Sequence, residues 1–149
     1  MPPAFIAALV AVFLGGALLA LQAPTNAMLA RAVGSPVNAA LVSFGVGLAG
    51  LFVAALAFGA RPNAAAVRDI PWYGWAGGVY GAIFVAVAAF AAPRLGVTFF
   101  LTVAIAGQLA MALFLDRYGA FGLDAVAISW QRVAGILLVL GGAWLVQQR

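Results

Sequence analysis

Charged residues are so sparse in this chain that they leave five long stretches without any charge. These uncharged stretches are 1–30, 32–60, 70–93, 95–115 and 133–148. A helix that crosses the hydrocarbon core of a bilayer, which is roughly 30 Å thick, needs about 20 apolar residues. We therefore predict five transmembrane helices, at residues 4–30, 37–59, 72–92, 96–115 and 129–147.

The composition excludes a water-soluble globule. Only 7% of the residues are charged, whereas a soluble domain averages roughly 25%. Backbone polar groups in lipid must be satisfied within the protein, which leaves helices or closed barrels. The apolar stretches lack the two-residue alternation of a barrel strand. The chain is thus predicted to be an all-α, polytopic membrane protein in contact with the lipid bilayer.

Several kinds of site are excluded because the chain has no Cys, His, Glu or Lys. Disulfides, zinc, haem and iron–sulfur sites all need Cys or His, so we expect no metal site and no cofactor. No general base or nucleophile–base pair is available within the membrane, and we expect no enzyme. Seven arginines against three aspartates do not form the basic patch that nucleic-acid binding requires.

The first stretch is predicted to be a retained helix rather than a signal peptide. It has no Arg or Lys at its start, and it far exceeds the roughly 7–15 residues of a signal-peptide apolar core. The connections between the predicted helices are short, and the segment 116–128 is the only one with room for a small excursion. We expect residues 1–149 to form a single transmembrane domain.

The arginines give almost no bias for membrane orientation. With five crossings, one side holds Arg61, Arg68, Arg117 and Arg132, and the other holds Arg31, Arg94 and Arg149. This difference is too small to set the orientation by the positive-inside rule. Two alternatives remain open: a single orientation decided by other factors, or dual topology, in which copies insert both ways and pair antiparallel.

Polar side chains within the predicted spans are the candidate substrate-binding residues. Gln22 and Asn26 share one face of the first helix, and Pro24 between them is expected to kink it. This amide pair could bind a polar ligand or cation, or it could cap the kink or bridge to a neighbouring helix. Gln108 could line a cavity or form a hydrogen bond across helices. Tyr80 could project its hydroxyl into the same cavity as Gln108.

Small residues recur at spacings that allow close helix packing. Gly74 and Gly78 form one row in the third predicted helix, Gly81 lies on a second row, and Gly107 lies beside a row of alanines in the fourth. Such rows let helix backbones approach each other, which is a main source of helix association in lipid. They predict a tight bundle, and they do not distinguish one function from another.

Seven short motifs, in order along essentially the whole chain, resemble the five-helix YdcZ-like branch of the drug/metabolite transporter superfamily. They are LQAPTN at 21–26, GSP at 34–36, GGVYG at 77–81, PRLG at 93–96, GQ at 107–108, LDRYG at 115–119 and RVAG at 132–135. The resemblance implies a bacterial inner-membrane protein and a half-size transporter. Two such units would make the ten-helix pore of larger relatives, as a homodimer or as a heterodimer with a related five-helix subunit.

Two hypotheses of function follow. The first is a transporter or exporter of a small metabolite or drug-like solute, working by alternating access across a dimer. The second is a non-catalytic membrane subunit that scaffolds or regulates a partner complex. Related small multidrug resistance proteins exchange protons through a membrane-embedded glutamate, and this chain has no glutamate with which to do so.

Overall fold

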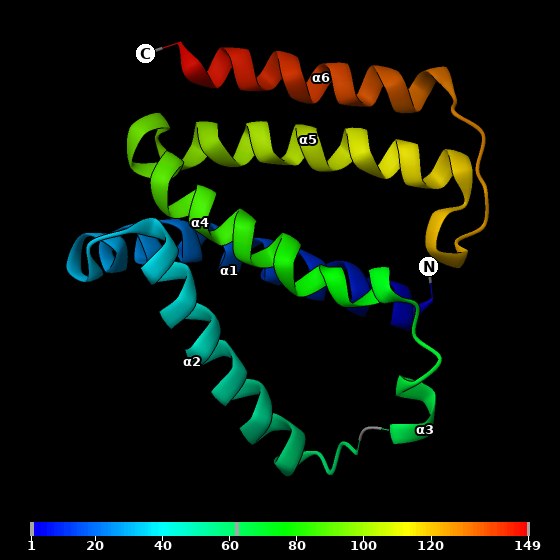
Figure 1. Ribbon diagram of the computed structural model, residues 1–149. Coiled ribbons are helices and arrows are strands. Elements are labelled where there is room, and N and C mark those ends of the chain that lie inside the picture. Colours follow the sequence, from blue (N-terminus) through cyan, green and yellow to red (C-terminus); the bar gives the residue numbers. More distant parts are fainter. Residues whose placement is uncertain (1, 62, 149) are drawn as a thin grey trace. The chain divides into compact units, whose positions relative to one another are not determined.

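The computed structural model describes residues 2–61 and 63–148, and throughout these residues the regular structure is helical (Figure 1). This confirms the all-α prediction. The elements in chain order are α1 (Pro3–Val33), α2 (Pro36–Ala57), α3 (Ala64–Val67), the 3-10 helix η1 (Trp72–Ala76), α4 (Gly77–Leu95), α5 (Val97–Tyr118), the 3-10 helix η2 (Ala120–Gly122) and α6 (Trp130–Gln147).

Four described helical segments are long and apolar enough to cross a membrane. They are Pro3–Val33, Pro36–Ala57, Trp72–Leu95 and Val97–Tyr118. The fifth predicted span also forms a helix, α6, which has 18 residues but is not among these four. Gln131 and Arg132 occupy its first turn and Gln147 ends it, so the apolar part is short. Its crossing of the membrane stays a prediction.

The helix boundaries differ from the predicted ones by a few residues, and at the end of α5 the physical reason is clear. The helix predicted to end at Leu115 continues to Tyr118 and stops at Gly119, which adopts a left-handed conformation with φ +57°. Glycine takes this conformation without the steric cost that a side chain brings. The helix predicted from Trp72 starts instead as η1, and α3 lies in a connection for which no helix was predicted.

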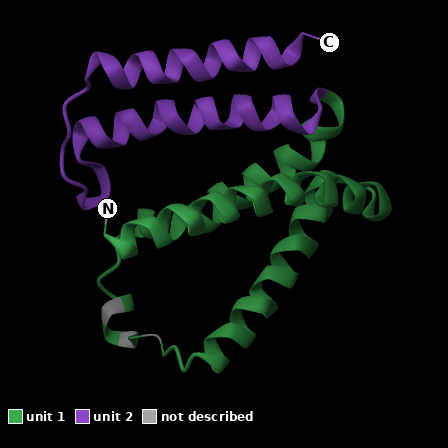
Figure 2. Cartoon of the chain, turned by 180° about the vertical axis from the view of Figure 1, so that it is seen from behind, with its two compact units in different colours: residues 1–94 green, residues 95–149 purple. Residues whose placement is uncertain are grey.

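The described chain divides into two compact units, residues 1–94 (unit 1) and residues 95–149 (unit 2) (Figure 2). Unit 1 contains α1 to α4, and unit 2 contains α5, η2 and α6.

In unit 1, α1 and α2 are joined by a tight and well-capped connection. Gly34 ends α1 with φ +86°. The Ser35 side chain accepts a hydrogen bond from the Asn38 backbone N–H at 3.0 Å, and Pro36 is the first residue of α2. The Asn38 side-chain amide in turn donates to the Val33 carbonyl at 3.0 Å. These bonds satisfy backbone groups at both helix ends, which would otherwise lack partners.

The buried residues of unit 1 are mostly alanines, which lets its helices approach closely. They are Ala23 and Ala27 on α1, Ala39 and Ala40 on α2, and Val85, Ala88, Ala89 and Ala92 on α4. Large apolar side chains lie outside this core, and Phe13, Leu41 and Leu51 are each more than 70% exposed. An apolar exterior over a small-residue interior is what a lipid environment permits, because lipid solvates apolar side chains.

In unit 2, α5 and α6 lie side by side (Figure 1). The connecting segment folds back onto the end of α5, where the Val126 N–H donates to the Asp116 carbonyl at 2.7 Å. Ser129 caps α6 by accepting a hydrogen bond from the Arg132 N–H at 3.4 Å. Unit 2 is therefore a helical hairpin with both ends of its connection anchored.

Candidate functional site

The polar segment of α1 is built around Pro24, which lies inside the helix. A proline has no N–H, so the carbonyl four residues earlier loses its helical partner. Thr25 adds to this local rearrangement, because its hydroxyl donates to the Leu21 carbonyl at 3.0 Å and to the Gln22 carbonyl at 2.9 Å. The threonine is thus engaged with its own helix, which leaves the two amide side chains as the free polar groups of this segment.

Asn26 is the only polar side chain buried among the residues that the structure describes. It is 4% exposed, and its Nδ2 atom has no hydrogen-bond partner there. A buried donor without a partner costs roughly 1–3 kcal/mol, so native structures contain few of them. The Asn26 amide is therefore the polar group of unit 1 whose burial most needs an explanation.

The other three predicted substrate-binding residues are less enclosed. Gln22 is half-buried and lies one helical turn before Asn26, on the same face of α1. Tyr80, on α4 of unit 1, is 63% exposed. Gln108, on α5 of unit 2, is exposed. A polar side chain on the outside of a helix in lipid needs a partner of its own, because the hydrocarbon offers none.

The four glycines predicted to pack helices have different surroundings. At Gly81, an added Cβ would lie 3.2 Å from the Phe44 ring of α2, so the absence of a side chain lets that ring reach the backbone of α4. At Gly74, an added Cβ would lie 2.7 Å from the Ile70 side chain, which is a local contact. At Gly78 and Gly107 it would meet no atom of the described chain within 4 Å.

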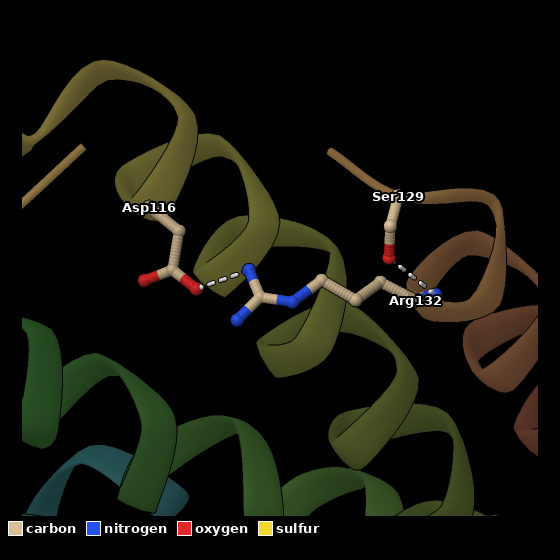
Figure 3. A network of polar contacts seen from close by, with 3 residues as sticks. All are labelled: Asp116, Ser129 and Arg132. Atoms are coloured by element: carbon tan, nitrogen blue, oxygen red, sulfur yellow. Dashed lines mark hydrogen bonds and ion pairs between the residues drawn. The ribbon is translucent and has the colours of Figure 1, made fainter. Parts of the chain in front are cut away.

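An ion pair joins the two helices of unit 2 at the end of the hairpin where they are connected. The Arg132 guanidinium at the start of α6 donates to the Asp116 carboxylate at the end of α5, with 2.9 Å between nitrogen and oxygen (Figure 3). The Arg132 and Asp116 side chains are 41% and 36% exposed, so solvent reaches the pair. Both residues line a cavity of about 410 Å³ between α5 and α6, together with Leu109, Ala112, Leu113, Gly135 and Ile136.

Sequence reasoning did not pair Asp116 with Arg132. It used Arg132 in the count of arginines on each side of the membrane. The signal was nevertheless available, because two antiparallel helices with a connection of moderate length bring the last turn of one beside the first turn of the next. A carboxylate and a guanidinium at those two positions are within reach of each other.

Comparison with known proteins decides the family. The profile of a family described as "Putative inner membrane exporter, YdcZ" matches residues 7–145. The chain belongs to the YdcZ family. The match extends over all four long apolar helices and most of α6, and it confirms the resemblance drawn from the sequence motifs. No curated protein and no solved structure matches the chain.

Membership of the YdcZ family fixes the location and the broad class of the protein. It is a helical protein of the inner membrane that passes through the bilayer several times. The family is described as exporters, which indicates a transport protein rather than an enzyme.

Proposed function

We propose that this YdcZ-family protein exports a small neutral or weakly charged solute by alternating access, and that residues 1–149 act as one half of a dimeric transporter. The observation that carries the proposal is the Asn26 amide, which is buried in unit 1 and has no partner for its Nδ2 atom in the described chain. This donor is shielded from lipid, and under the proposal a solute reaches it when the helices move apart during alternating access.

The substrate-binding residues we propose are Gln22, Asn26, Tyr80 and Gln108. Gln22 and Asn26 support this role through their shared helix face next to Pro24, since interrupted helices commonly form the binding sites of transporters. Amides and a phenol can each donate and accept hydrogen bonds. Such a set favours a solute with hydroxyl, carbonyl or amine groups over one that needs a fixed ion pair.

The exposed polar residues support a dimer. The Gln108 amide in unit 2 and the Tyr80 hydroxyl in unit 1 lie on surfaces that would otherwise face lipid. A second subunit, identical or related, would supply hydrogen-bond partners that a bilayer cannot. We propose that the two subunits pair antiparallel, because the near-equal arginine count lets the chain insert in either direction.

The direct test is transport by the purified full chain in proteoliposomes, over a panel of small polar metabolites and drug-like solutes. We expect at least one solute to be moved, and its transport to be lost in Asn26→Leu. A folded dimer that moves and binds nothing in the panel would contradict the proposal.

Antiparallel pairing is tested by single-cysteine labelling from each side of intact cells, since the chain has no native Cys. We expect each terminus to be labelled from both sides. The pair of substitutions Ala60→Lys and Ala65→Lys should then fix one orientation and impair a homodimer. Strictly one-sided labelling of the unmodified chain would show a single orientation instead.

The alternative function is a scaffold subunit, which would need close-packing faces but no binding site. The contact between Gly81 and Phe44 is of the kind that such a subunit uses. The two functions differ in what Asn26→Leu does to activity. In a scaffold, the replacement of the unpaired amide by Leu would leave the activity of the partner complex unchanged.

A further inference from the structure

A second polar feature of unit 1 lies where the end of α1, the start of α2 and the end of α4 meet. These three helix ends enclose a cavity of about 580 Å³. Its walls include two arginines, Arg31 from the last turn of α1 and Arg94 from the last turn of α4. The cavity does not include Asn26, Gln22 or Tyr80 in its lining, so it is separate from the proposed transport site.

Both arginines lack a carboxylate partner within residues 2–61 and 63–148. The salt bridge found among the described residues is that of Arg132 with Asp116 in unit 2, and neither Arg31 nor Arg94 takes part in one. Two cations at one cavity without a counter-ion raise its positive potential, and their mutual repulsion falls when an anion binds.

Arg94 is held in place by its own helix. Its guanidinium lies over the Phe90 ring, 3.7 Å from the ring centroid, and one nitrogen donates to the Phe90 carbonyl. A guanidinium carries five N–H donors in a rigid fork. The contact with Phe90 uses only part of this set, and the remaining donors can bind an oxyanion in a two-point geometry.

The start of α2 adds a partial positive charge and one hydroxyl. The charge comes from the aligned peptide dipoles of this 22-residue helix. Pro36 has no N–H and the Asn38 N–H is bound to Ser35, so the helix acts through its dipole and not through these two residues' amides. Ser35 lines the cavity, and its oxygen accepts from the Asn38 N–H. The hydroxyl hydrogen of Ser35 thus remains available to donate to a bound oxygen.

We infer that this cavity binds the phosphate group of an anionic phospholipid. Phosphate is the oxyanion that paired arginines and a helix N-terminus recognise together. A lipid is favoured over a soluble phosphate because Ala30, Phe90 and Pro93 present accessible apolar surface beside the arginines, against which an acyl chain can pack. With α2 as the span between them, α1 and α4 cross the bilayer in the same direction, so their C-terminal ends lie on one side at headgroup depth. Basic pockets between helices bind anionic headgroups at that depth.

The test is native mass spectrometry of the purified full chain after incubation with phosphatidylglycerol or phosphatidylcholine of identical acyl chains. We expect phosphatidylglycerol to be retained in preference to phosphatidylcholine. Arg31→Gln and Arg94→Gln should each reduce that retention about fivefold, the value expected for one basic residue near a membrane surface. Arg94→Lys should reduce retention less than Arg94→Gln does, because Lys keeps the positive charge but lacks the forked N–H donors of the guanidinium.

Arg117→Gln is the matched control. Arg117 occupies the last turn of α5 as Arg94 does that of α4, but it does not line the cavity, so its replacement should leave retention unchanged. Equal retention of the two lipids, or equal loss in Arg117→Gln, would overturn the inference.

A second measurement tests for a soluble ligand, with glycerol 3-phosphate as the probe. If the unmodified chain binds it, Arg94→Gln abolishes that binding and no lipid is retained, then the phosphate belongs to a soluble ligand and the lipid assignment is overturned. Circular dichroism of each variant confirms that it is folded.

Discussion

The two units differ in how their buried and charged polar groups are partnered. Unit 1 leaves groups without partners: the Asn26 Nδ2 atom is buried and unpaired, and Arg31 and Arg94 have no carboxylate in the described chain. Unit 2 pairs the polar groups of its hairpin, through Asp116 with Arg132 and through the Thr102 hydroxyl, which donates to the Thr98 carbonyl at 2.8 Å. Unpaired polar groups in an apolar setting are costly, and this cost is the basis for our proposal that unit 1 binds ligands.

The contrast extends to the connections within each unit. The α1–α2 connection is short and brings helix ends and arginines to one cavity. The α5–α6 connection is longer and fastened by Gly119, by the bond from Val126 to Asp116 and by the Ser129 cap. We interpret unit 2 as a frame, meaning a unit that mainly supports the fold, and we interpret unit 1 as the unit that contains most of the proposed binding residues. The predictions below test this division.

Asn26→Leu is expected to have the largest effect. Transport should fall about 100-fold, because a cargo oxygen without its donor inside an apolar site carries a desolvation cost of up to ~3 kcal/mol. Thermal stability should stay equal or rise, because the unpaired amide is gone. Transport in proteoliposomes and thermal unfolding in detergent measure the two effects.

Asn38→Leu is the matched control for that change. Asn38 is a partnered asparagine of unit 1, since its side chain donates to the Val33 carbonyl. Its replacement should lower the free energy of unfolding by ~1 kcal/mol and leave transport by the folded protein unchanged. The division of roles would be contradicted if Asn26→Leu lost stability and kept transport.

The sequence predicted the helices well and the environments of side chains poorly. Uncharged stretches of about 20 residues specify membrane helices almost by themselves, and Gly34-Ser35-Pro36 specifies the turn between two of them through cap chemistry. The partner of Arg132 and the burial of Asn26 depend instead on which helix faces come together. A hydrophobic stretch carries little of that information, because in lipid all faces of a helix can be apolar.

Gly119→Ala should have the next largest effect and should act on stability alone. Gly119 has φ +57°, and an added Cβ would lie 2.8 Å from the Leu123 carbonyl oxygen, a backbone atom that cannot move aside cheaply. The left-handed conformation costs roughly 1–2 kcal/mol for a residue with a side chain, and the clash adds to it. We expect unfolding in detergent to shift by ~3 kcal/mol in total.

Gly122→Ala separates the two causes. Gly122 also has a positive φ, of +80°, but an added Cβ there would meet nothing within 4 Å. It should therefore cost only the conformational part, ~1 kcal/mol. Equal losses in the two variants would show that the close contact at Gly119 does not matter.

Gln108→Leu tests whether unit 2 contributes to binding beyond its role as a frame. Leu is close to Gln in volume, so packing should survive while the donors and the acceptor of the amide are lost. We expect transport to fall about tenfold, the equivalent of ~1.4 kcal/mol, with assembly intact. A thermal-shift measurement paired with the transport assay distinguishes this from a helix-bridging role. Retained transport with stability lowered by ~0.6 kcal/mol, the average for hydrogen bonds between membrane helices, would make Gln108 a packing residue.

The smallest effect is expected at the Asp116–Arg132 pair, although it is the most conspicuous polar contact of unit 2. The side chains are 36% and 41% exposed, so water and ions screen their attraction. A double-mutant cycle compares the unfolding free energies of Asp116→Asn, Arg132→Gln and the double variant. It should give a coupling free energy between the two side chains of ~0.2–1 kcal/mol, which decreases as salt is added. The pair joins α5 and α6 at the connected end of the hairpin and is outside the proposed substrate-binding residues. Transport by each folded single variant should therefore match that of the unmodified chain. A coupling well above this range, or loss of transport in Asp116→Asn with the fold intact, would mean that the charged end of the hairpin takes part in transport. Unit 2 would then be more than a frame.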